Sequence, residues 1–302
     1  MNGQTLTHEA AYPAAVKEKE KRHFSVSQLL TYQKCPLHYK FRYIDGLKIP
    51  PRSVMTLGSS VHAALEHNFR QKIKSHKDLK VNDVLDAFSD SFDLAKPETL
   101  WNKDESPSMV KDEGVNLVCA YHTGKDRTGE PFIYRELNPK TRKYEKKPVK
   151  ALSPTIQPIM VEEAFEVNFD NVDYKFIGRM DLVDDKMRIR DTKTSARTPT
   201  QDQVDTDLQM TAYSMGFRVK TGKIEKGLVM DYIVKNGVPK VVSVATKRTE
   251  EDIQRLLNLM ARIAHAIDCG VFYCSCNPIF CNPNNCGYWD LGNGRGCRYG
   301  IG

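Results

Sequence analysis

Two different hydrophobic periods divide the chain, and each predicts a different kind of secondary structure. From Phe24 to about residue 122 the apolar residues recur at helical spacing, whereas after Ser153 they alternate with a period of two. The first part is therefore expected to form helices and the second part a sheet. The expected helices are two short ones around a break at Cys35-Pro36, one that starts at Gly58, and two over residues 82–97 and 107–122.

The alternating part predicts an antiparallel meander that continues into further strands and helices. Its first three runs are separated by Asp170-Asn171 and Asp184-Asp185-Lys186, which are turn residues. Asn236-Gly237 marks a later hairpin, and a helix begins at Thr249 and ends at Gly270. We expect an α/β protein with a mixed sheet of about five strands flanked by helices. The strands are predicted over residues 160–169, 173–181, 187–195, 228–234 and 240–245, and a further helix over residues 206–220.

Two segments carry no apolar period. Residues 1–22 mix Ala, Lys and Glu, and we expect a mobile tail there. Residues 124–150 are rich in Lys and Arg and predict an exposed hairpin or loop. This is either a solvated surface or a strip that meets phosphates, with Tyr134 and Tyr144 available for stacking. The rest, residues 23–302, is expected to be one domain. Its parts are a helical part with His62 (23–122), a basic insert (123–157), a core (158–247) and a C-terminal helix with cysteines (248–302).

Composition and charge restrict the class of protein. The 302 residues are 40% hydrophobic and 27% charged, with a mean hydropathy of -0.52, which is typical of a globular protein. No apolar run of about 18 residues is present, and the first residues do not resemble a secretory signal. We therefore expect no membrane association and a reducing cytoplasmic setting. The net charge of +7 allows nucleic acid as a partner but does not demonstrate it.

The cysteines are grouped unevenly. Five of the eight lie between Cys274 and Cys297. In a reducing compartment such a group favours a metal or iron–sulfur site, because soft thiolates are ligands for these metals. Buried structural thiols are the alternative.

Asp191-Thr192-Lys193 is the first candidate for chemistry. On a strand, residues two apart project from the same face, so this carboxylate and this ammonium lie side by side. Asp181 ends the preceding strand, and the intervening turn would fold it back to lie roughly opposite Asp191. Two acids at close range repel unless a cation separates them, and Mg²⁺ or Mn²⁺ accepts such ligands. The lysine could then position or deprotonate a water, or offset charge on a phosphate. A surface ion pair is the alternative.

Several motifs in a fixed order resemble those of the PD-(D/E)XK nucleases of the RecB type. The family pattern is Gly-x-x-Asp, Asp-x-Lys-Thr and Gln-x-x-x-Tyr, and further upstream a histidine-bearing helix and an N-terminal signature. The resemblance covers about residues 24–297 and implies the restriction-endonuclease-like fold. The matching residues here are Gly178 and Asp181; Asp191, Lys193 and Thr194; Gln209 and Tyr213; Gly58, His62, Leu65 and Glu66; and Ser27-Gln28-Leu29, Tyr32, Cys35-Pro36 and Tyr39.

This resemblance implies roles for the matching residues. Lys193 would be the catalytic lysine, while Gln209 and Tyr213, one helical turn apart, would contact the substrate or brace the site. The ligands of the Mg²⁺ or Mn²⁺ ion would be His62, Asp181 and Asp191. In the first strand, Glu162 lies where relatives often keep a glutamate, with Glu163 and Glu166 as alternatives.

The cysteines resemble those of family members with an iron–sulfur cluster, such as the AddB nuclease domain and the CRISPR spacer-acquisition nucleases. In these relatives one early cysteine joins three late ones, although a Gly-rich insertion before Cys297 departs from their spacing. A [4Fe-4S] cluster linking the two ends of the chain, and structural rather than redox-active, is the implied cofactor, with a Cys₄ zinc site as the alternative. The preferred ligands are Cys35, Cys281, Cys286 and Cys297, with Cys274 and Cys276 as substitutes.

The function implied is hydrolysis of phosphodiester bonds by a metal-dependent DNase, an exonuclease that acts on ends or single strands in recombination, repair or processing. Relatives often work beside helicases or other recombination factors, which are the implied partners besides DNA. Two alternatives stay open. One is a catalytically silent nucleic-acid-binding module, and the other is an endonuclease or RNase of the same fold.

Overall fold

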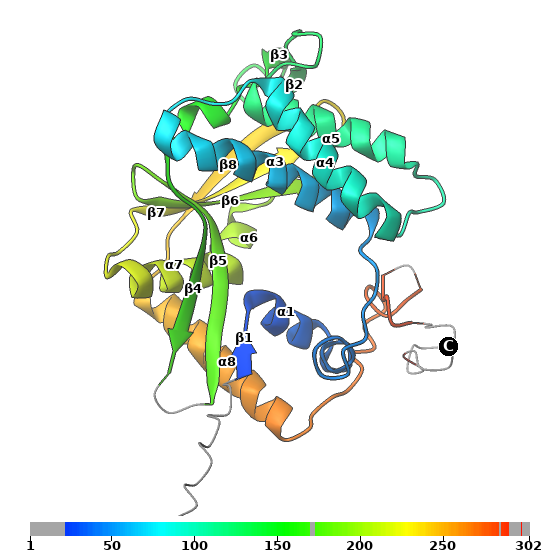
Figure 1. Ribbon diagram of the computed structural model, residues 1–302, viewed down its shortest axis with the longest axis vertical. Helices are drawn as coiled ribbons and strands as arrows, with labels where there is room; N and C mark the ends of the chain where they lie inside the picture. Colours follow the sequence, from blue (N-terminus) through cyan, green and yellow to red (C-terminus); the bar gives the residue numbers. More distant parts are fainter. Residues whose placement is uncertain (1–21, 170–172, 284, 290–296, 298–302) are drawn as a thin grey trace, which may run out of the picture.

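The structure is a computed structural model that describes residues 22–169, 173–283, 285–289 and 297. The expected N-terminal tail lies outside these residues except for Arg22, which begins strand β1. Figure 1 shows a sheet with helices on both faces, which confirms the predicted α/β class with a mixed sheet. In the described part of the chain, no helix is both long and apolar enough to cross a membrane.

Three helices cover one face of the sheet. The first of them begins five residues before the predicted start at Gly58. Ser106 caps the third helix by accepting a hydrogen bond from the backbone N–H of Met109 at 3.2 Å. Gly114 lets that helix approach its neighbour, because a Cβ there would lie 2.1 Å from the Phe88 ring. The three helices are α3 (Ser53–Ser75), α4 (Val81–Ala95) and α5 (Pro107–His122).

The sheet has six strands rather than about five. The predicted meander forms its antiparallel part, in the order β4, β5, β6. A crossover through α6 (Gln201–Asp205) and α7 (Leu208–Thr221) then places β7 parallel to β6, and the predicted hairpin at Asn236-Gly237 joins β7 to β8. The strands are β1 (Arg22–Phe24), β4 (Pro158–Asn168), β5 (Tyr174–Asp184), β6 (Arg188–Ser195), β7 (Gly227–Val234) and β8 (Lys240–Thr246).

Strand β5 has an incompletely paired edge. One edge is paired with β4 over almost its whole length, so its two other partners must share the opposite edge. There, β1 pairs with residues 174–176 and β6 pairs only with Leu182 and Val183. Between them, residues 177–181 have no strand partner on this edge among the described residues. The sheet therefore contains a gap, and Asp181 lies at its border.

The N- and C-terminal parts of the domain lie together. The predicted break at Cys35-Pro36 separates α1 (Val26–Lys34) from α2 (Pro36–Tyr39), and a π-helical turn, Lys40–Ile44, follows. The chain after α8 (Glu250–Asp268) returns to these helices (Figure 1). The hydrogen bonds that join the two parts run from Tyr32 Oη to Val271 O (2.7 Å), from Leu37 N to Tyr273 O (3.1 Å) and from Tyr288 Oη to Leu47 O (2.6 Å).

The basic insert contains a separate two-stranded hairpin. Its strands are β2 (Ile133–Leu137) and β3 (Tyr144–Pro148), which pair with each other and not with the central sheet. The predicted hairpin is therefore confirmed, and it lies at the end of the molecule next to α5 (Figure 1).

The glycine of the Gly-x-x-Asp motif has a packing role. A Cβ at Gly178 in β5 would lie 2.4 Å from the ring of Phe165, and a Cβ at Gly216 in α7 would lie equally close to the same ring. The buried Phe165 side chain is therefore enclosed by two glycines and has no space for an added methyl group.

We predict that Gly178→Ala lowers the free energy of unfolding by about 1–3 kcal/mol, because it overpacks the site of the Phe165 ring. Gly227→Ala is the matched control, since it also lies in a strand and its nearest neighbour atom would be 3.9 Å away. Urea denaturation of both variants measures the difference. Equal stability of the two variants would refute the packing role.

Candidate active site

The gap beside β5 brings together the acidic residues of two strands. Asp191 and Lys193 project from the same face of β6, as predicted, and Lys193 Nζ lies 3.0 Å from each carboxylate oxygen of Asp191. The Asp191 side chain is fully buried, whereas the Lys193 side chain is 38% exposed. Asp181 approaches from β5, and its Oδ2 accepts a hydrogen bond of 3.4 Å from the backbone N–H of Thr192.

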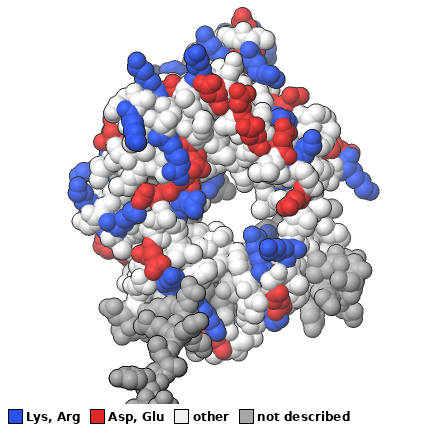
Figure 2. All heavy atoms as spheres, in the orientation of Figure 1, with Lys and Arg blue, Asp and Glu red and all other residues white. Residues whose placement is uncertain are grey.

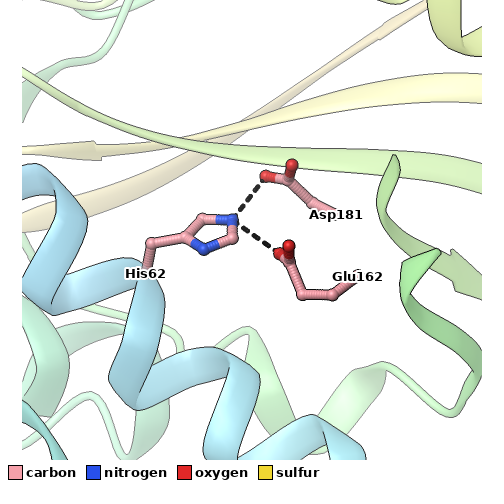
Figure 3. A group of neighbouring side chains, drawn as sticks. All are labelled: His62, Glu162 and Asp181. Atoms are coloured by element: carbon pink, nitrogen blue, oxygen red, sulfur yellow. Dashed lines mark hydrogen bonds and ion pairs between the residues drawn. The ribbon is translucent and has the colours of Figure 1, made fainter. Parts of the chain in front are cut away.

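His62 reaches this site from α3. The helix passes close to β6 because Gly58 has no side chain, and a Cβ there would lie 3.3 Å from Thr194 Oγ1. Figure 3 shows the imidazole pointing at two carboxylates, with Nε2 2.8 Å from Asp181 Oδ2 and 3.4 Å from Glu162 Oε1. In the described ranges, these three side chains form the one group of His, Cys, Asp or Glu whose ligand atoms lie within 4.8 Å of one another.

Glu162 is directed into the site by an unusual backbone conformation. It lies between the pairs Val161–Leu182 and Glu163–Met180, so it is opposite Asp181. Its φ of 53° is in the left-handed region, which costs a non-glycine residue of order 1–3 kcal/mol. Its Oε1 is buried and has no hydrogen-bond partner. The strained backbone therefore directs the Glu162 carboxylate toward His62, and Oε1 keeps acceptor capacity that no hydrogen bond of the described residues uses.

The other two candidate glutamates point elsewhere. Glu163 forms an ion pair of 2.5 Å with Lys220, and Glu166 forms one of 3.0 Å with Lys175. Of the three glutamates that the sequence offered, Glu162 is the one beside His62.

The carboxylates of the site lie close enough to shift the pKa values of one another and of His62. Complete burial, together with the charge of Asp181, raises the pKa of Asp191 to about 7. Burial opposes ionisation of Asp181 as well, but its hydrogen bond to His62 and the charge of the imidazolium hold its pKa below the usual value. Burial would lower the pKa of His62, and Asp181 and Glu162 outweigh that effect and raise it to about 9. A metal bound to these atoms would therefore displace a proton from His62.

Two residues of α7 connect the lysine to Asp181. Gln209 Oε1 accepts a hydrogen bond of 2.7 Å from Lys193 Nζ, and Gln209 Nε2 donates one of 2.6 Å to Tyr213 Oη. Tyr213 Oη donates in turn to Asp181 Oδ1 at 3.0 Å. Burial raises the pKa of Tyr213, which keeps this donor protonated. Sequence reasoning left open whether these residues contact substrate or brace the site, and these contacts favour bracing.

A buried ion cluster under β6 was not foreseen. The guanidinium of Arg190 donates to both carboxylate oxygens of Asp231, at 2.9 and 2.8 Å, and lies 3.5 Å from Asp184. Arg190 precedes Asp191 in the sequence, and together with His62 and Glu162 it lines a small cavity. The signal for it was Asp231 within the otherwise apolar run of β7, because a buried carboxylate requires a partner.

The cysteines form a second group, away from the acidic residues. Cys274 Sγ lies 3.7 Å from Cys281 Sγ and 3.9 Å from Cys297 Sγ. Of the two substitutes, Cys274 therefore joins this group, while Cys276 is exposed. Burial raises the pKa of the Cys286 thiol, and the charges of neighbouring thiols add to this. One pocket is lined by Cys35, Cys274, Cys281, Cys286 and Cys297. Most of the Gly-rich insertion lies outside the described residues.

The chain belongs to the PD-(D/E)XK nuclease superfamily, whose family model matches residues 23–291. It is similar in structure to a protein from Eubacterium rectale described as "Putative exonuclease", with a TM-score of 0.51 and 15% identity over 89% of each chain. It also matches the structure of SSO0001, with a TM-score of 0.35 and 13% identity over 93% of this chain and 90% of that one. No curated protein sequence matches it.

We predict that Tyr213→Phe lowers metal affinity or cleavage activity by about 10- to 100-fold, because Asp181 loses a hydrogen bond that orients it. Tyr174→Phe is the control, since it also removes a hydroxyl that donates to a carboxylate, that of Asp268. Titration of cleavage activity with Mg²⁺ measures the effect. Cleavage by Tyr213→Phe with both the rate and the Mg²⁺ dependence of the wild type would exclude the bracing role.

Proposed function

We propose that this nuclease is a divalent-metal-dependent deoxyribonuclease, an exonuclease that hydrolyses phosphodiester bonds at ends or in single strands during recombination, repair or processing. The observation that carries this proposal is the convergence of His62, Glu162 and Asp181 beside the Lys193–Asp191 pair. These groups come from four separate elements, α3, β4, β5 and β6, and meet at one gap in the sheet.

The donor set at the gap fits Mg²⁺ or Mn²⁺. Carboxylate oxygens are the ligands that these hard cations prefer, and Mn²⁺ also accepts imidazole. The unsatisfied Oε1 of Glu162 supports a cation at this place. We assign His62, Glu162 and Asp181 as ligands and retain Asp191, whose fully buried carboxylate borders the same gap. The bound ion supplies charge stabilisation for the phosphate and activates water.

Lys193 is the proposed catalytic lysine. Burial tends to lower the pKa of its ammonium, but the charges of Asp191 and Asp181 outweigh that effect and raise it, so the group stays cationic. Gln209 holds Nζ in place while the partly exposed side chain stays accessible. A fixed cation at this position can orient a water and offset the charge that develops on a pentavalent phosphate.

The shape of the molecule supports access by a single strand or a free end. Figure 2 shows an opening between the α3 layer and the α1 region, with Lys and Arg side chains at its edge. The incompletely paired edge of β5 lies beside this opening (Figure 1). A strand with a free end can enter such an opening, whereas a continuous duplex would require the protein to open. Cationic edges attract the phosphate backbone.

We predict that Lys193→Ala lowers cleavage by at least about 100-fold while changing DNA affinity by less than about tenfold, because the lysine acts on the transition state. End-labelled single- and double-stranded DNA, incubated with Mg²⁺, Mn²⁺ or EDTA, provides the measurement. Lys220→Ala is the control, since Lys220 instead pairs with Glu163.

Comparable turnover of Lys193→Ala and wild type would refute the catalytic assignment. DNA binding without metal-dependent cleavage by the wild type would favour the silent binding module instead. Internal products from circular DNA, or cleavage of RNA, would favour an endonuclease or RNase.

We further propose that the cysteine pocket holds a [4Fe-4S] cluster with a structural role in a reducing cytoplasm. Cys35, Cys281, Cys286 and Cys297 remain the preferred ligands, and the soft thiolates fit iron or zinc. Cys274 Sγ lies 3.7 Å from Cys281 Sγ and 3.9 Å from Cys297 Sγ. A tetrahedral Cys₄ zinc site with Zn–S bonds of about 2.3 Å also places its sulfurs about 3.8 Å apart, so zinc is the alternative that metal analysis must distinguish from the cluster. A helicase or another recombination factor is the proposed partner class.

We predict that Cys286→Ser lowers thermal stability and bleaches the brown colour of an iron–sulfur cluster, because metal binding contributes folding free energy. Cys269→Ser is the control, since Cys269 is exposed and does not line the pocket. Elemental analysis of anaerobically purified protein gives the metal. Zinc without iron would favour a Cys₄ zinc site instead of the cluster. The absence of both metals would favour structural thiols that bind no metal.

A further inference from the structure

The β2–β3 hairpin has two faces of different character. Directly opposite residues of an antiparallel pair project from the same face. One face, here called the inner face, carries the pairs Tyr134–Lys147 and Glu136–Glu145. The other, here called the outer face, carries the pairs Ile133–Pro148, Arg135–Lys146 and Leu137–Tyr144.

The charges of the inner face are satisfied within the protein. Glu136 forms an ion pair of 2.5 Å with Lys147, and the pKa of its carboxyl is lowered by Lys147 and further by Lys240 of β8. Glu145 accepts a hydrogen bond of 2.6 Å from Asn138. Tyr134 and Lys147 are half-buried. The inner face is therefore less exposed than the outer face at the Tyr134–Lys147 pair, and it holds both acidic residues of the hairpin.

The outer face consists of exposed side chains whose charges are unpaired. Arg135 and Lys146 lie directly opposite each other, an arrangement of like charges that destabilises a strand pair. Neither forms an ion pair with any described residue. Beside them, Tyr144 is 72% exposed and Leu137 is 48% exposed. Two cations next to an exposed aromatic ring match the phosphates and bases of a nucleic acid.

The hairpin is anchored firmly enough to present this face. At its base, Val149 N donates to Phe132 O at 2.8 Å, and Gly124, with φ of 71°, leaves no space for a Cβ beside Val149 O. At the turn, Asn138 Oδ1 accepts a hydrogen bond of 2.9 Å from Lys140 N, and Asn138 O accepts one from Arg142 N. The turn adds three more basic residues, Lys140, Arg142 and Lys143.

We propose that the outer face of the hairpin is a second contact for the nucleic acid, outside the catalytic gap. Arg135 and Lys146 bind phosphates, and a base stacks on Tyr144. The contact is independent of sequence, because the face offers no set of donors and acceptors that distinguishes one base from another. This inference rests on the proposed function, since the ligand is the substrate of the nuclease.

The test compares substitutions on the outer face with a substitution of Lys147, the neighbouring lysine on the inner face. Binding of a fluorescent single-stranded oligonucleotide is measured by anisotropy in EDTA over a range of salt concentrations. The double variant Arg135→Ala/Lys146→Ala is expected to lower the slope of log affinity against log salt by about 1.4, about 0.7 for each lost phosphate contact. Tyr144→Ala is expected to raise the Kd for the oligonucleotide by about 5-fold or more. Lys147→Ala, on the inner face, is expected to keep the slope of the wild type.

The outcomes separate this inference from the proposed function. A wild type that binds and cleaves DNA, together with a double variant whose slope equals that of Lys147→Ala, would overturn the hairpin contact alone. A wild type that neither binds nor cleaves nucleic acid would overturn both. Thermal melting of each variant shows whether it is folded, and the exposed positions of the substitutions make unfolding unexpected.

Discussion

The shared edge of β5 is the constraint on which the rest of the structure depends. Because β4 occupies one edge of this strand, β1 and β6 must divide the other, and they leave residues 177–181 unpaired there. A complete ladder would have filled this space with backbone hydrogen bonds. The gap instead admits side chains from both faces of the sheet. His62 of α3 and Tyr213 of α7 can therefore both reach Asp181.

Strands β4 and β5 also exchange the faces that they direct toward the two hydrophobic cores near this gap. Val161 and Leu182, which pair, belong to the apolar core under α3, α4 and α5. Phe165 and Met180 have the same parity in their strands but belong to the core under α7 and α8. Strict alternation would keep residues of equal parity on one face. The β4–β5 pair thus exchanges its two faces near Glu162 and near Asp181, which lies opposite it. The positive φ of Glu162 occurs at this exchange.

This change of face explains which parts of the site the sequence could predict. The motif residues on β5, β6 and α7 were identified from their resemblance to the family pattern. The period of two predicted five of the six strands, although β5 continues to Asp184 and does not end at Asp181 as predicted. The resemblance favoured Glu162 over Glu163 and Glu166, but periodicity could not decide among the three, because it assumes an unbroken alternation. Strand β1 was also missed, since three residues are too short for a period and depend on the free edge of β5. The ion pair of Arg190 and Asp231 required knowledge of which strands are neighbours.

The two groups of reactive side chains are carried by different parts of the fold. The acidic site is built on α3, β4, β5 and β6, whereas the cysteine pocket is built by the start of α2 and the chain after α8. The cysteine-bearing segment also holds the connection between the π-helical turn and α3, since Tyr288 donates to Leu47 O and Gly287 packs against Ile49. That connection leads from the α1 region, on one side of the opening in Figure 2, to α3 on the other. A metal in the pocket would therefore stabilise the border of the opening, and its loss would affect how substrate reaches the site more than the chemistry within it.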